Sequence, residues 1–349
     1  MIAKIQIAKN HMEKVLLILT ALSIFVQNCK SSENTNDKIK NQRNFKFFAL
    51  AEFLPYQEFE LIYPELKKLD IEMILAVREG EIDSESLRRM KFRAWPVLKK
   101  EKGYWLSVWT ADDFYKLVEE VLNKINVEWI SLDFEPTWQI TTNLSFSGSL
   151  NQFVASITQL NPTDEIYNSG KQKIQEIVDL IHSRGKKVMC VFLPFIADDL
   201  LDGDQDISRI FGIYVPPNCD EYSFMLYTTI MKTFGEKYGF KFERPEYFVY
   251  VYSKDIYNMF GEKSAIDVGL VGEDLFGNKG YNSPEELRKD ISAGLAAGIK
   301  NFHVWALDNM KKDGKWEVSQ WLDIRYIEPV EPQEDEAVLR IRNFFKALD

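Results

Sequence analysis

From residue 44 onward, short apolar runs of strand length alternate with segments of helical periodicity. The runs are rich in β-branched and aromatic residues, as expected for strands that are buried on both faces. Eight such runs occur, at residues 45–53, 71–77, 92–98, 127–135, 187–195, 222–230, 266–272 and 301–307. This alternation predicts an α/β fold with a parallel sheet whose strands are connected by helices.

Helical patterns fill several of the intervals between the runs. Four are clear, at residues 56–69, 110–125, 171–185 and 283–298, and two weaker ones cover residues 229–239 and 246–261. Eight strands with intervening helices in about 265 residues match the count and size of a (β/α)8 TIM barrel. A doubly wound open sheet is the alternative, but no glycine-rich phosphate-binding turn follows the first run.

We expect a single domain behind an N-terminal processing segment. Residues 1–28 contain lysines and then the apolar run of residues 15–26, which is too short to span a bilayer but suits a signal peptide. Residues 29–44 are predicted to be a polar tether and residues 45–315 the barrel. Residues 316–349 are predicted to be a C-terminal extension with a short helix on the outside of the barrel.

The order of an apolar run, Cys29 and a polar tract resembles a bacterial lipoprotein signal. The resemblance implies that Cys29 is lipidated and anchors the domain to a membrane of a bacterial cell envelope, outside the cytoplasm. Asn28 stands where that family usually has a small residue. An ordinary cleaved signal peptide and an uncleaved anchor are the alternatives, and both also place the domain outside the cytoplasm.

The composition argues against one class of partner and favours another. A net charge of −10, with no basic cluster interleaved with aromatic residues, argues against nucleic-acid binding. Phe, Tyr and Trp make up 13% of the chain, and flat aromatic rings stack on sugars in carbohydrate-binding clefts. An oligo- or polysaccharide is therefore the expected partner. The alternative explanation of the aromatic content is a core rich in aromatic residues. The protein is expected to be a monomer.

The cysteine and acidic patterns do not predict a metal or another cofactor. The cysteines lack metal-ligand spacing. Cys190 and Cys219 could pair in an oxidising compartment, but Cys190 lies in an apolar run and is interpreted as a buried hydrophobic residue. The acidic stretch of residues 202–206 begins like a calcium-binding loop, but a residue other than glycine stands at the tight turn.

Two carboxylates end the fourth apolar run. Asp133 and Glu135 are two residues apart on a predicted strand, so their side chains point to the same side and those of Leu132 and Phe134 to the other. The C-terminal ends of barrel strands form the face where chemistry occurs. Neighbouring carboxylates disfavour joint ionisation, so one pKa should rise and supply the general acid that glycosidic bond cleavage needs. The alternative is that both acids pair with Arg or Lys.

Three strand ends together resemble the markers of the glycoside hydrolase family 18 barrel. They are the "LDFE" of residues 132–135, the "MLYT" of residues 225–228 and Trp305 in the last strand. The resemblance implies that Glu135 is the general acid and that Asp133 orients the N-acetyl group of the substrate. It further implies that Tyr227 donates a hydrogen bond to that group and that Trp305 forms the floor of the sugar site.

Two residues depart from the family pattern. Ser131 and Thr228 stand where the family has aspartates, and no Ser-x-Gly-Gly-like third strand is present. Substrate-assisted cleavage depends on those acids. A non-catalytic carbohydrate-binding or adhesive surface lipoprotein with a degenerate barrel is therefore the alternative to a hydrolase.

A second enzymatic interpretation uses Glu273 as a nucleophile. The Glu-Pro pair at residues 135–136 also resembles the acid/base of clan A retaining glycosidases, and Glu273 follows the seventh run near the place of their nucleophile. That mechanism needs two carboxyl groups about 5–5.5 Å apart. Phe134 stands where clan A has Asn, and Glu273 could equally be a solvated loop acid beside Asp274.

Other residues near predicted strand ends are candidates for binding substrate: Glu52, Arg78, Trp138 and Asp308. An arginine in the mouth of a barrel could hold a substrate hydroxyl or fix a carboxylate. An internal ion pair of Arg78 with Asp308 or Glu52 is the alternative. The long connections at residues 137–170 and 197–221 are expected to be loops on the same face. His303 is interpreted as structural, because the sequence suggests no acid or serine partner for it.

Overall fold

The computed structural model describes residues 43–145, 148–274 and 277–346. The predicted signal peptide, Cys29 and most of the tether lie outside the described residues. The chain divides into two units, of which the larger comprises Phe45–Asp323 and Ile327–Asp349. This larger unit contains the barrel, and all the residues considered below belong to it.

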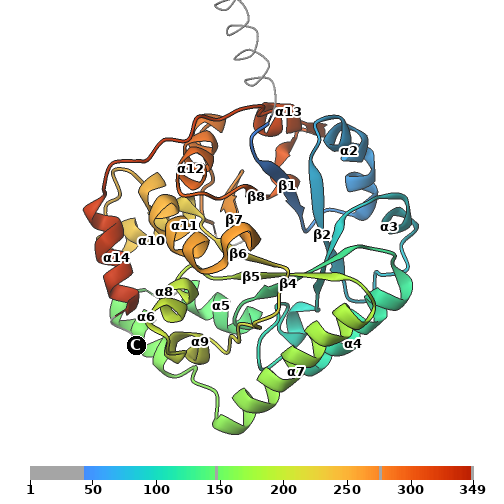
Figure 1. Ribbon diagram of the computed structural model, residues 1–349, viewed down its shortest axis with the longest axis horizontal. Helices are drawn as coiled ribbons and strands as arrows, with labels where there is room; N and C mark the ends of the chain where they lie inside the picture. The colour runs from blue at the N-terminus through green and yellow to red at the C-terminus, as the bar shows by residue number, and fades with distance from the viewer. Residues whose placement is uncertain (1–42, 146–147, 275–276, 347–349) are drawn as a thin grey trace, which may run out of the picture. The chain divides into compact units, whose positions relative to one another are not determined.

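Eight parallel strands form a closed barrel in chain order, and the eighth pairs with the first (Figure 1). They are β1 (Lys46–Ala51), β2 (Glu72–Arg78), β3 (Arg93–Val97), β4 (Trp129–Phe134), β5 (Lys187–Phe192), β6 (Glu221–Met225), β7 (Ser264–Gly269) and β8 (Asn301–Trp305). Each predicted run overlaps one strand, which confirms the (β/α)8 barrel and excludes the open sheet. The runs are apolar throughout because their side chains pack both into the barrel and against the surrounding helices.

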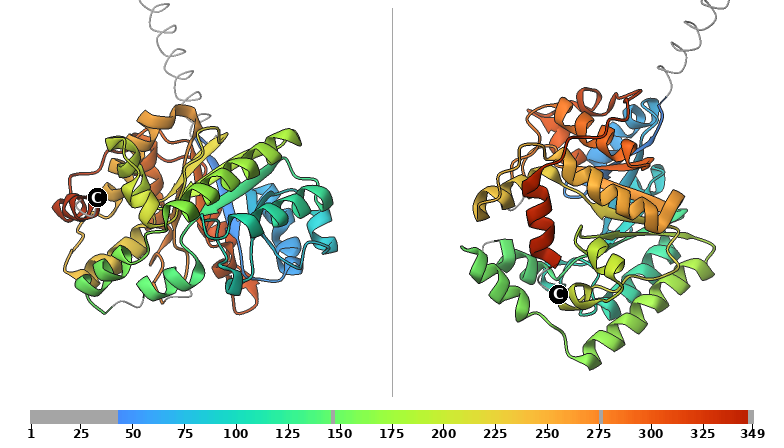
Figure 2. Two further views of the ribbon diagram at one scale, coloured as in Figure 1. Left: turned by 90° about the horizontal axis from the view of Figure 1, so that it is seen from below. Right: turned by 60° about the vertical axis from the view of Figure 1, so that its left-hand side comes forward.

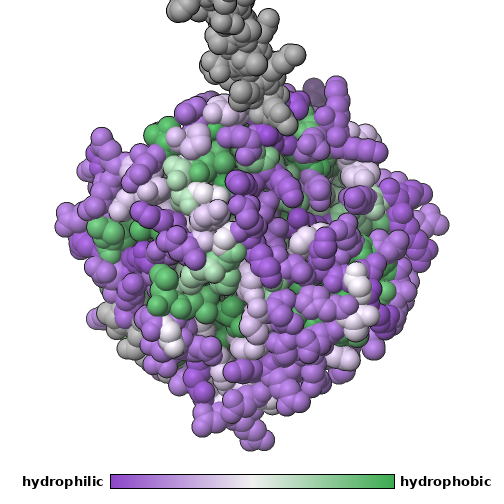
Figure 3. Space-filling model, in the orientation of Figure 1, coloured by the Kyte–Doolittle hydropathy of each residue, from purple (hydrophilic) through white to green (hydrophobic). Residues whose placement is uncertain are grey.

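Helices surround the barrel (Figures 1 and 2). The six predicted ones are confirmed as α2 (Tyr56–Lys68), α4 (Ala111–Lys124), α7 (Asp164–Ser183), α10 (Thr228–Tyr238), α11 (Glu246–Phe260) and α12 (Pro284–Ala296), and α3 (Glu85–Arg89) is an additional short one. Among the described residues, no helix is long and apolar enough to cross a membrane. The face shown in Figure 3 is mostly hydrophilic, with hydrophobic side chains gathered in a few patches.

The two long connections contain short helices rather than loops alone. The first contains α5 (Trp138–Ser145) and α6 (Leu150–Thr158), and the second contains α8 (Ile196–Asp202) and α9 (Asp206–Ile210). Ser149 is the N-cap of α6, and its hydroxyl accepts a hydrogen bond from the backbone N–H of Gln152. These helices bring additional side chains to the C-terminal ends of β4 and β5.

The C-terminal extension contains α13 (Val318–Leu322) and α14 (Glu336–Lys346). The guanidinium of Arg342 on α14 donates to Asp198 of α8 and to Asp255 of α11, at 2.6 Å each. The ring of Phe345 stacks on Phe195, with the ring centroids 5.0 Å apart. The helix lies outside the strands as expected, but it also contributes a side chain to the cavity described below.

A disulfide joins Cys190 in β5 to Cys219, which lies just before β6. The interpretation of Cys190 as an unpaired hydrophobic residue is therefore wrong, although its burial is confirmed. The two cysteines are 29 residues apart in sequence, but the pairing of β5 with β6 brings their Cα atoms to 6.2 Å.

Candidate active site

A cavity of about 450 Å³ opens where the strands of the barrel end. The residues of its inner part that matter below are acids, aromatic rings and one serine: Glu52, Trp95, Trp105, Ser131, Asp133, Glu135, Tyr227, Asp267 and Trp305. The alternation of β4 turns Asp133 and Glu135 towards this cavity. The side chains of Leu132 and Phe134 are fully buried, and Phe134 stacks on Phe192 of β5.

Glu135 has the features of a general acid. Its side chain is partly exposed to the cavity, and it forms no hydrogen bond or ion pair with another described residue. Burial, and then the negative charge of Asp267, raises the pKa of Glu135 to about 8. This shift favours the protonated carboxyl group near neutral pH, and the group faces a cavity that a ligand could enter. The alternative in which Glu135 pairs with Arg or Lys has no support among the described residues.

Asp133 lies next to this acid with an unsatisfied oxygen. Its side chain is buried, and Oδ1 has no hydrogen-bond partner among the described residues. Burial, and then the charges of Glu135, Asp267 and Glu52, raises the pKa of Asp133 well above its usual range. The indole Nε1 of Trp95, which also lines the cavity, is likewise buried and has no hydrogen-bond partner in the described part of the chain. Buried polar atoms are normally paired, so these two positions are suited to contact a bound ligand.

Glu52 fixes two aromatic side chains of the site. Its carboxylate accepts a hydrogen bond from the Tyr104 hydroxyl at 2.9 Å and another from Nε1 of Trp305 at 2.8 Å. Burial, and then the charge of Asp308, raises the pKa of Glu52 to about 8, although the two hydrogen bonds oppose the rise. The bond to Nε1 sets the orientation of the Trp305 ring, which lines the cavity.

Tyr227 completes this part of the wall. Its ring lies 5.7 Å from that of Trp305, tilted by 30°. A Cβ atom at Gly269 of β7 would lie 2.9 Å from the carbonyl oxygen of Trp305 and 3.2 Å from the Tyr227 ring. Glycine at position 269 therefore allows the ends of β6, β7 and β8 to approach one another.

Arg78 and Asp308, predicted to bind substrate, hold the backbone after β1 instead. Arg78 Nη1 donates to the carbonyl oxygens of Glu52 and Leu54, at 2.8 and 3.0 Å. The Asp308 carboxylate accepts from the backbone N–H groups of Glu52, Phe53 and Leu54, at 2.9, 2.7 and 2.8 Å. Neither side chain lines the cavity, and Nε of Arg78 donates to Glu81 at 2.9 Å. Both are residues that position Glu52.

Two further candidates are not brought into the cavity. Trp138 stacks on Trp105 with the ring centroids 5.3 Å apart and does not line the cavity itself. Glu273 is exposed on the loop after β7 and is absent from the cavity lining, whereas its neighbour Asp274 belongs to it. The structure thus gives no support to Glu273 as the partner of Glu135 in a retaining mechanism.

Asp267 is an acid of the site that sequence reasoning missed. It lies on β7, lines the cavity and pairs in register with His303 of β8. Its Oδ1 accepts from Nδ1 of His303 at 2.6 Å and from the Ser223 hydroxyl at 2.5 Å. His303 therefore has both an acid and a serine partner, contrary to expectation. The signal in the sequence was a single aspartate within the apolar run "IDVGLVG", but its neighbours depend on the register of three strands.

An ion pair continues this polar group towards the other end of the barrel. Nε2 of His303 lies 3.4 Å from Glu221, and Glu221 accepts from Nη1 of Arg93 at 2.6 Å. Burial lowers the pKa of His303, but the charges of Asp267 and Glu221 outweigh burial, so the net shift is upward. His303 thus lies between two acids, Asp267 and Glu221, which favour its protonated form.

Thr228, at the position of a family aspartate, points away from the site. Its hydroxyl donates to Asp290 at 2.6 Å, and the Tyr281 hydroxyl donates to the same oxygen at 2.6 Å. Burial raises the pKa of Asp290 to about 7. Thr228 does not line the cavity. Asp267, on the adjacent strand β7, lines it together with Asp133 and Glu135.

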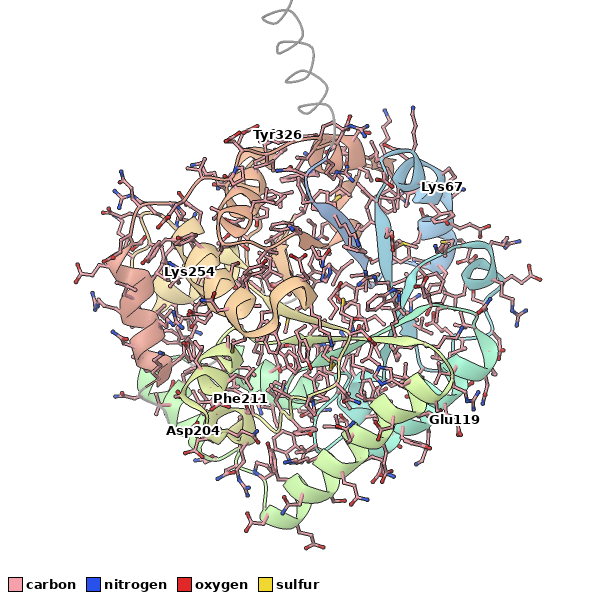
Figure 4. All side chains as sticks on the ribbon, viewed as in Figure 1. Lys67, Glu119, Asp204, Phe211, Lys254 and Tyr326 are labelled. Atoms are coloured by element: carbon pink, nitrogen blue, oxygen red, sulfur yellow. A yellow bond between two sulfur atoms is a disulfide. The ribbon has the colours of Figure 1, made fainter. Side chains whose placement is uncertain are left out.

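In the described part of the chain, one group of acids is close enough to hold a metal ion, and it lies outside the cavity: Asp199, Asp202 and Asp204. Asp199 already accepts from the backbone N–H groups of Ile207 and Ser208, at 3.1 and 2.9 Å. Asp204, labelled in Figure 4, is exposed. Among the residues that the structure describes, the carboxyl groups of the cavity do not form a second group of this kind.

No protein-family model matches the chain, and no curated protein matches its sequence. Among solved structures, the glycoside hydrolase domain of PgaB (BpsB) from Bordetella bronchiseptica is 12% identical, with 81% of this chain and 99% of that chain covered and a TM-score of 0.47. A β-glucosidase from Exiguobacterium marinum is 11% identical, with 88% and 99% covered and a TM-score of 0.44. A D-allulose 3-epimerase from Methylomonas sp. is 8% identical, with 88% and 99% covered and a TM-score of 0.43. Hydrolases and epimerases both occur, so these likenesses leave the activity open.

Proposed function

We propose that this protein is a glycoside hydrolase in which Glu135 is the general acid. The observation that carries the proposal is the Glu135 carboxyl group, which faces the cavity without a partner among the described residues and has a pKa raised to about 8. A general acid must be protonated at the working pH and must have space for the atom that it protonates. Glu135 meets both requirements.

In the proposed reaction, Glu135 donates its proton to the glycosidic oxygen as the bond from that oxygen to the anomeric carbon breaks. The resemblance to glycoside hydrolase family 18 suggests how the sugar cation is stabilised. Oδ1 of Asp133, buried and without a partner among described atoms, would orient an N-acetyl group whose oxygen attacks the anomeric carbon, and Tyr227 would donate to that group. Water then attacks the same carbon and returns a proton to Glu135, which restores the starting state. Trp305, held by Glu52, would support the sugar ring.

We also propose that the domain acts outside the cytoplasm, either secreted or anchored by a lipid on Cys29. The support is the signal-like segment of residues 1–28 together with the Cys190–Cys219 disulfide. Disulfides form and persist in oxidising compartments and are rare in the cytosol.

The test compares the wild type with Glu135→Gln on a panel of nitrophenyl glycosides that includes N-acetylated sugars. Glutamine keeps the shape of the side chain but has no proton to donate, so kcat should fall by about 10²–10⁴-fold, while the Kd for the sugar changes little. Glu119→Gln is the matched control, because Glu119 is exposed on α4 (Figure 4).

A carbohydrate-binding protein without turnover is the second candidate, since Ser131 and Thr228 replace family aspartates. It predicts that the wild type releases no product from any glycoside and that both proteins bind sugar equally well. Turnover that survives in Glu135→Gln would exclude Glu135 as the acid.

A further inference from the structure

One side of the cavity is lined mainly by apolar side chains, although Thr233, Lys237 and Tyr238 of α10 line the cavity as well. We call this side the apolar annex and define it by six residues: Leu144, Phe153, Phe195, Met231, Phe234 and Phe345. They come from the connections that follow β4, β5 and β6 and from the C-terminal helix α14. The right-hand view of Figure 2 shows α14, in dark red, beside these connections.

The rings of the annex pack on one another. Phe153 meets Phe234 edge-on with their centroids 5.4 Å apart, and Phe345 stacks on Phe195 at 5.0 Å. Phe345 also stacks on Phe234 at 5.9 Å, which links α14 to α10. The annex is therefore a built wall shared by four segments of the chain.

Buried ion pairs hold α14 in this position. Arg342, one turn before Phe345, donates to Asp198 and Asp255, and the Tyr252 hydroxyl donates to Asp198 at 2.7 Å. Asp198 is fully buried. Because breaking such a network is costly, Phe345 is fixed at the wall before any ligand arrives.

The annex begins beside the proposed general acid. Pro136, Thr141 and Leu144 follow Glu135 in the chain, and all three line the cavity. A general acid protonates the leaving group, so the part of the cavity next to Glu135 receives that group. Asp133 and Trp305 also line the cavity and supply its polar and aromatic part, where the sugar would lie.

We infer that the leaving group of the substrate is apolar, an alkyl or acyl chain rather than a second sugar. The inference rests on the proposed function. A sugar could stack one face on such a ring, but in the annex most of its hydroxyl groups would lie among four phenyl rings, a leucine and a methionine, and buried hydroxyl groups without partners are costly. An alkyl chain needs no such partners, and each methylene that it buries there should tighten binding about fourfold.

The experiment measures the binding of n-octyl and ethyl N-acetyl-β-D-glucosaminide to the Glu135→Gln variant by calorimetry, below the micellar concentration of the octyl compound. The variant is used because it does not consume the ligand. The octyl compound should bind at least about tenfold more tightly than the ethyl one. A ratio below about twofold would overturn the inference.

A second substitution tests where the chain binds. Phe234→Asp, added to Glu135→Gln, places a charge in the annex and should reduce the octyl-to-ethyl ratio to near one, whereas Phe234→Leu should preserve it. Leu61→Asp is the matched control, because Leu61 is 73% exposed on α2. If Phe234→Asp folds as judged by circular dichroism and leaves the ratio unchanged, the chain binds elsewhere and the annex has no such role.

These outcomes separate the inference from the proposed function. A high octyl preference that depends on Phe234, in a protein without turnover, would support the annex as a site for an apolar chain of a bound ligand and would reject both the hydrolase and the assignment of that chain as a leaving group. Turnover that depends on Glu135, without any octyl preference, supports the hydrolase and rejects the annex.

Discussion

At the scale of single residues, the acids of the cavity influence one another. The charge of Asp267 is the second cause, after burial, of the raised pKa of Glu135. If Glu135 must be protonated for turnover, kcat/KM should be level below the pKa of about 8 and fall tenfold per pH unit above it. Asp267→Asn removes the negative charge and should move this alkaline limb to lower pH.

The pH–rate profile checks this shift, and Glu273→Gln is its control. Glu273 is an exposed acid near the mouth of the cavity, so its neutralisation should leave both the limb and kcat in place. A loss of turnover in Glu273→Gln would instead restore the retaining mechanism that the cavity lining does not support.

Glu52 should make the free energy of unfolding depend on pH, in addition to any effect on turnover. Its pKa is about 8 in the folded protein, against an ordinary value near 4.5 in the unfolded chain. Between these pH values the folded state binds more protons than the unfolded state, so the free energy of unfolding falls as pH rises from about 4.5 to 8. Glu52→Gln mimics the protonated form, because its amide oxygen can accept from Nε1 of Trp305 while the Tyr104 hydroxyl, which donates to Glu52 in the wild type, turns to accept from the amide NH2 group.

The variant should therefore lose this part of the pH dependence, by on the order of 1–3 kcal/mol between pH 5 and 9. Urea denaturation at several pH values measures it, with Glu119→Gln as the exposed control. Parallel stability curves for Glu52→Gln and the wild type would show that Glu52 is ionised in the native state at neutral pH.

At the scale of elements, the turn between β1 and α2 depends on Asp308. One carboxylate satisfies three consecutive backbone N–H groups, those of residues 52–54. Asp308→Ala would leave them without this partner in a partly buried turn, so the free energy of unfolding should fall by about 1–3 kcal/mol. Urea denaturation measures this loss, and Glu119→Ala on the exposed face of α4 should cost less than about 0.5 kcal/mol. Equal stability of the two variants would mean that water replaces the carboxylate.

The elements were predictable because a parallel barrel uses continuous apolar runs, each of which stands out from the sequence. The period of a strand likewise predicted that Asp133 and Glu135 share a side. Contacts between strands were not predictable in this way. The pairing of Asp267 with His303 and of Cys190 with Cys219 depends on the register and order of neighbouring strands, which no local pattern contains. The structural role of Arg78 could not be predicted for the same reason, since its hydrogen-bond partners are backbone carbonyl groups of another segment.

At the scale of the whole molecule, the disulfide bears on two properties, namely the free energy of unfolding and the compartment in which the chain folds. It closes a segment with a sequence separation of 29 between two strands of the barrel. In the chain-entropy description, a loop of this length stabilises the folded state by about 3–4 kcal/mol. Replacing both cysteines by alanine should lower the free energy of unfolding by about this amount, as measured by urea denaturation. Both cysteines are fully buried, so a reductant should reach the disulfide only in the unfolded chain. The urea midpoint of the wild type measured with reductant should therefore equal that of the double variant.

The oxidation state of Cys190 and Cys219 indicates whether the chain folds in an oxidising or a reducing compartment. With residues 1–28 present, we expect export, a closed Cys190–Cys219 bond and recovery in the membrane fraction, because Cys29 would carry the lipid. Cys29→Ser should leave export and the disulfide intact but move the protein to the soluble extracytoplasmic fraction. Removal of residues 1–28 should retain the chain in a reducing compartment, where thiol alkylation would detect both cysteines as free. A Cys29→Ser protein that stays in the membrane would identify residues 15–26 as an uncleaved anchor, and a soluble wild type would identify an ordinary cleaved signal.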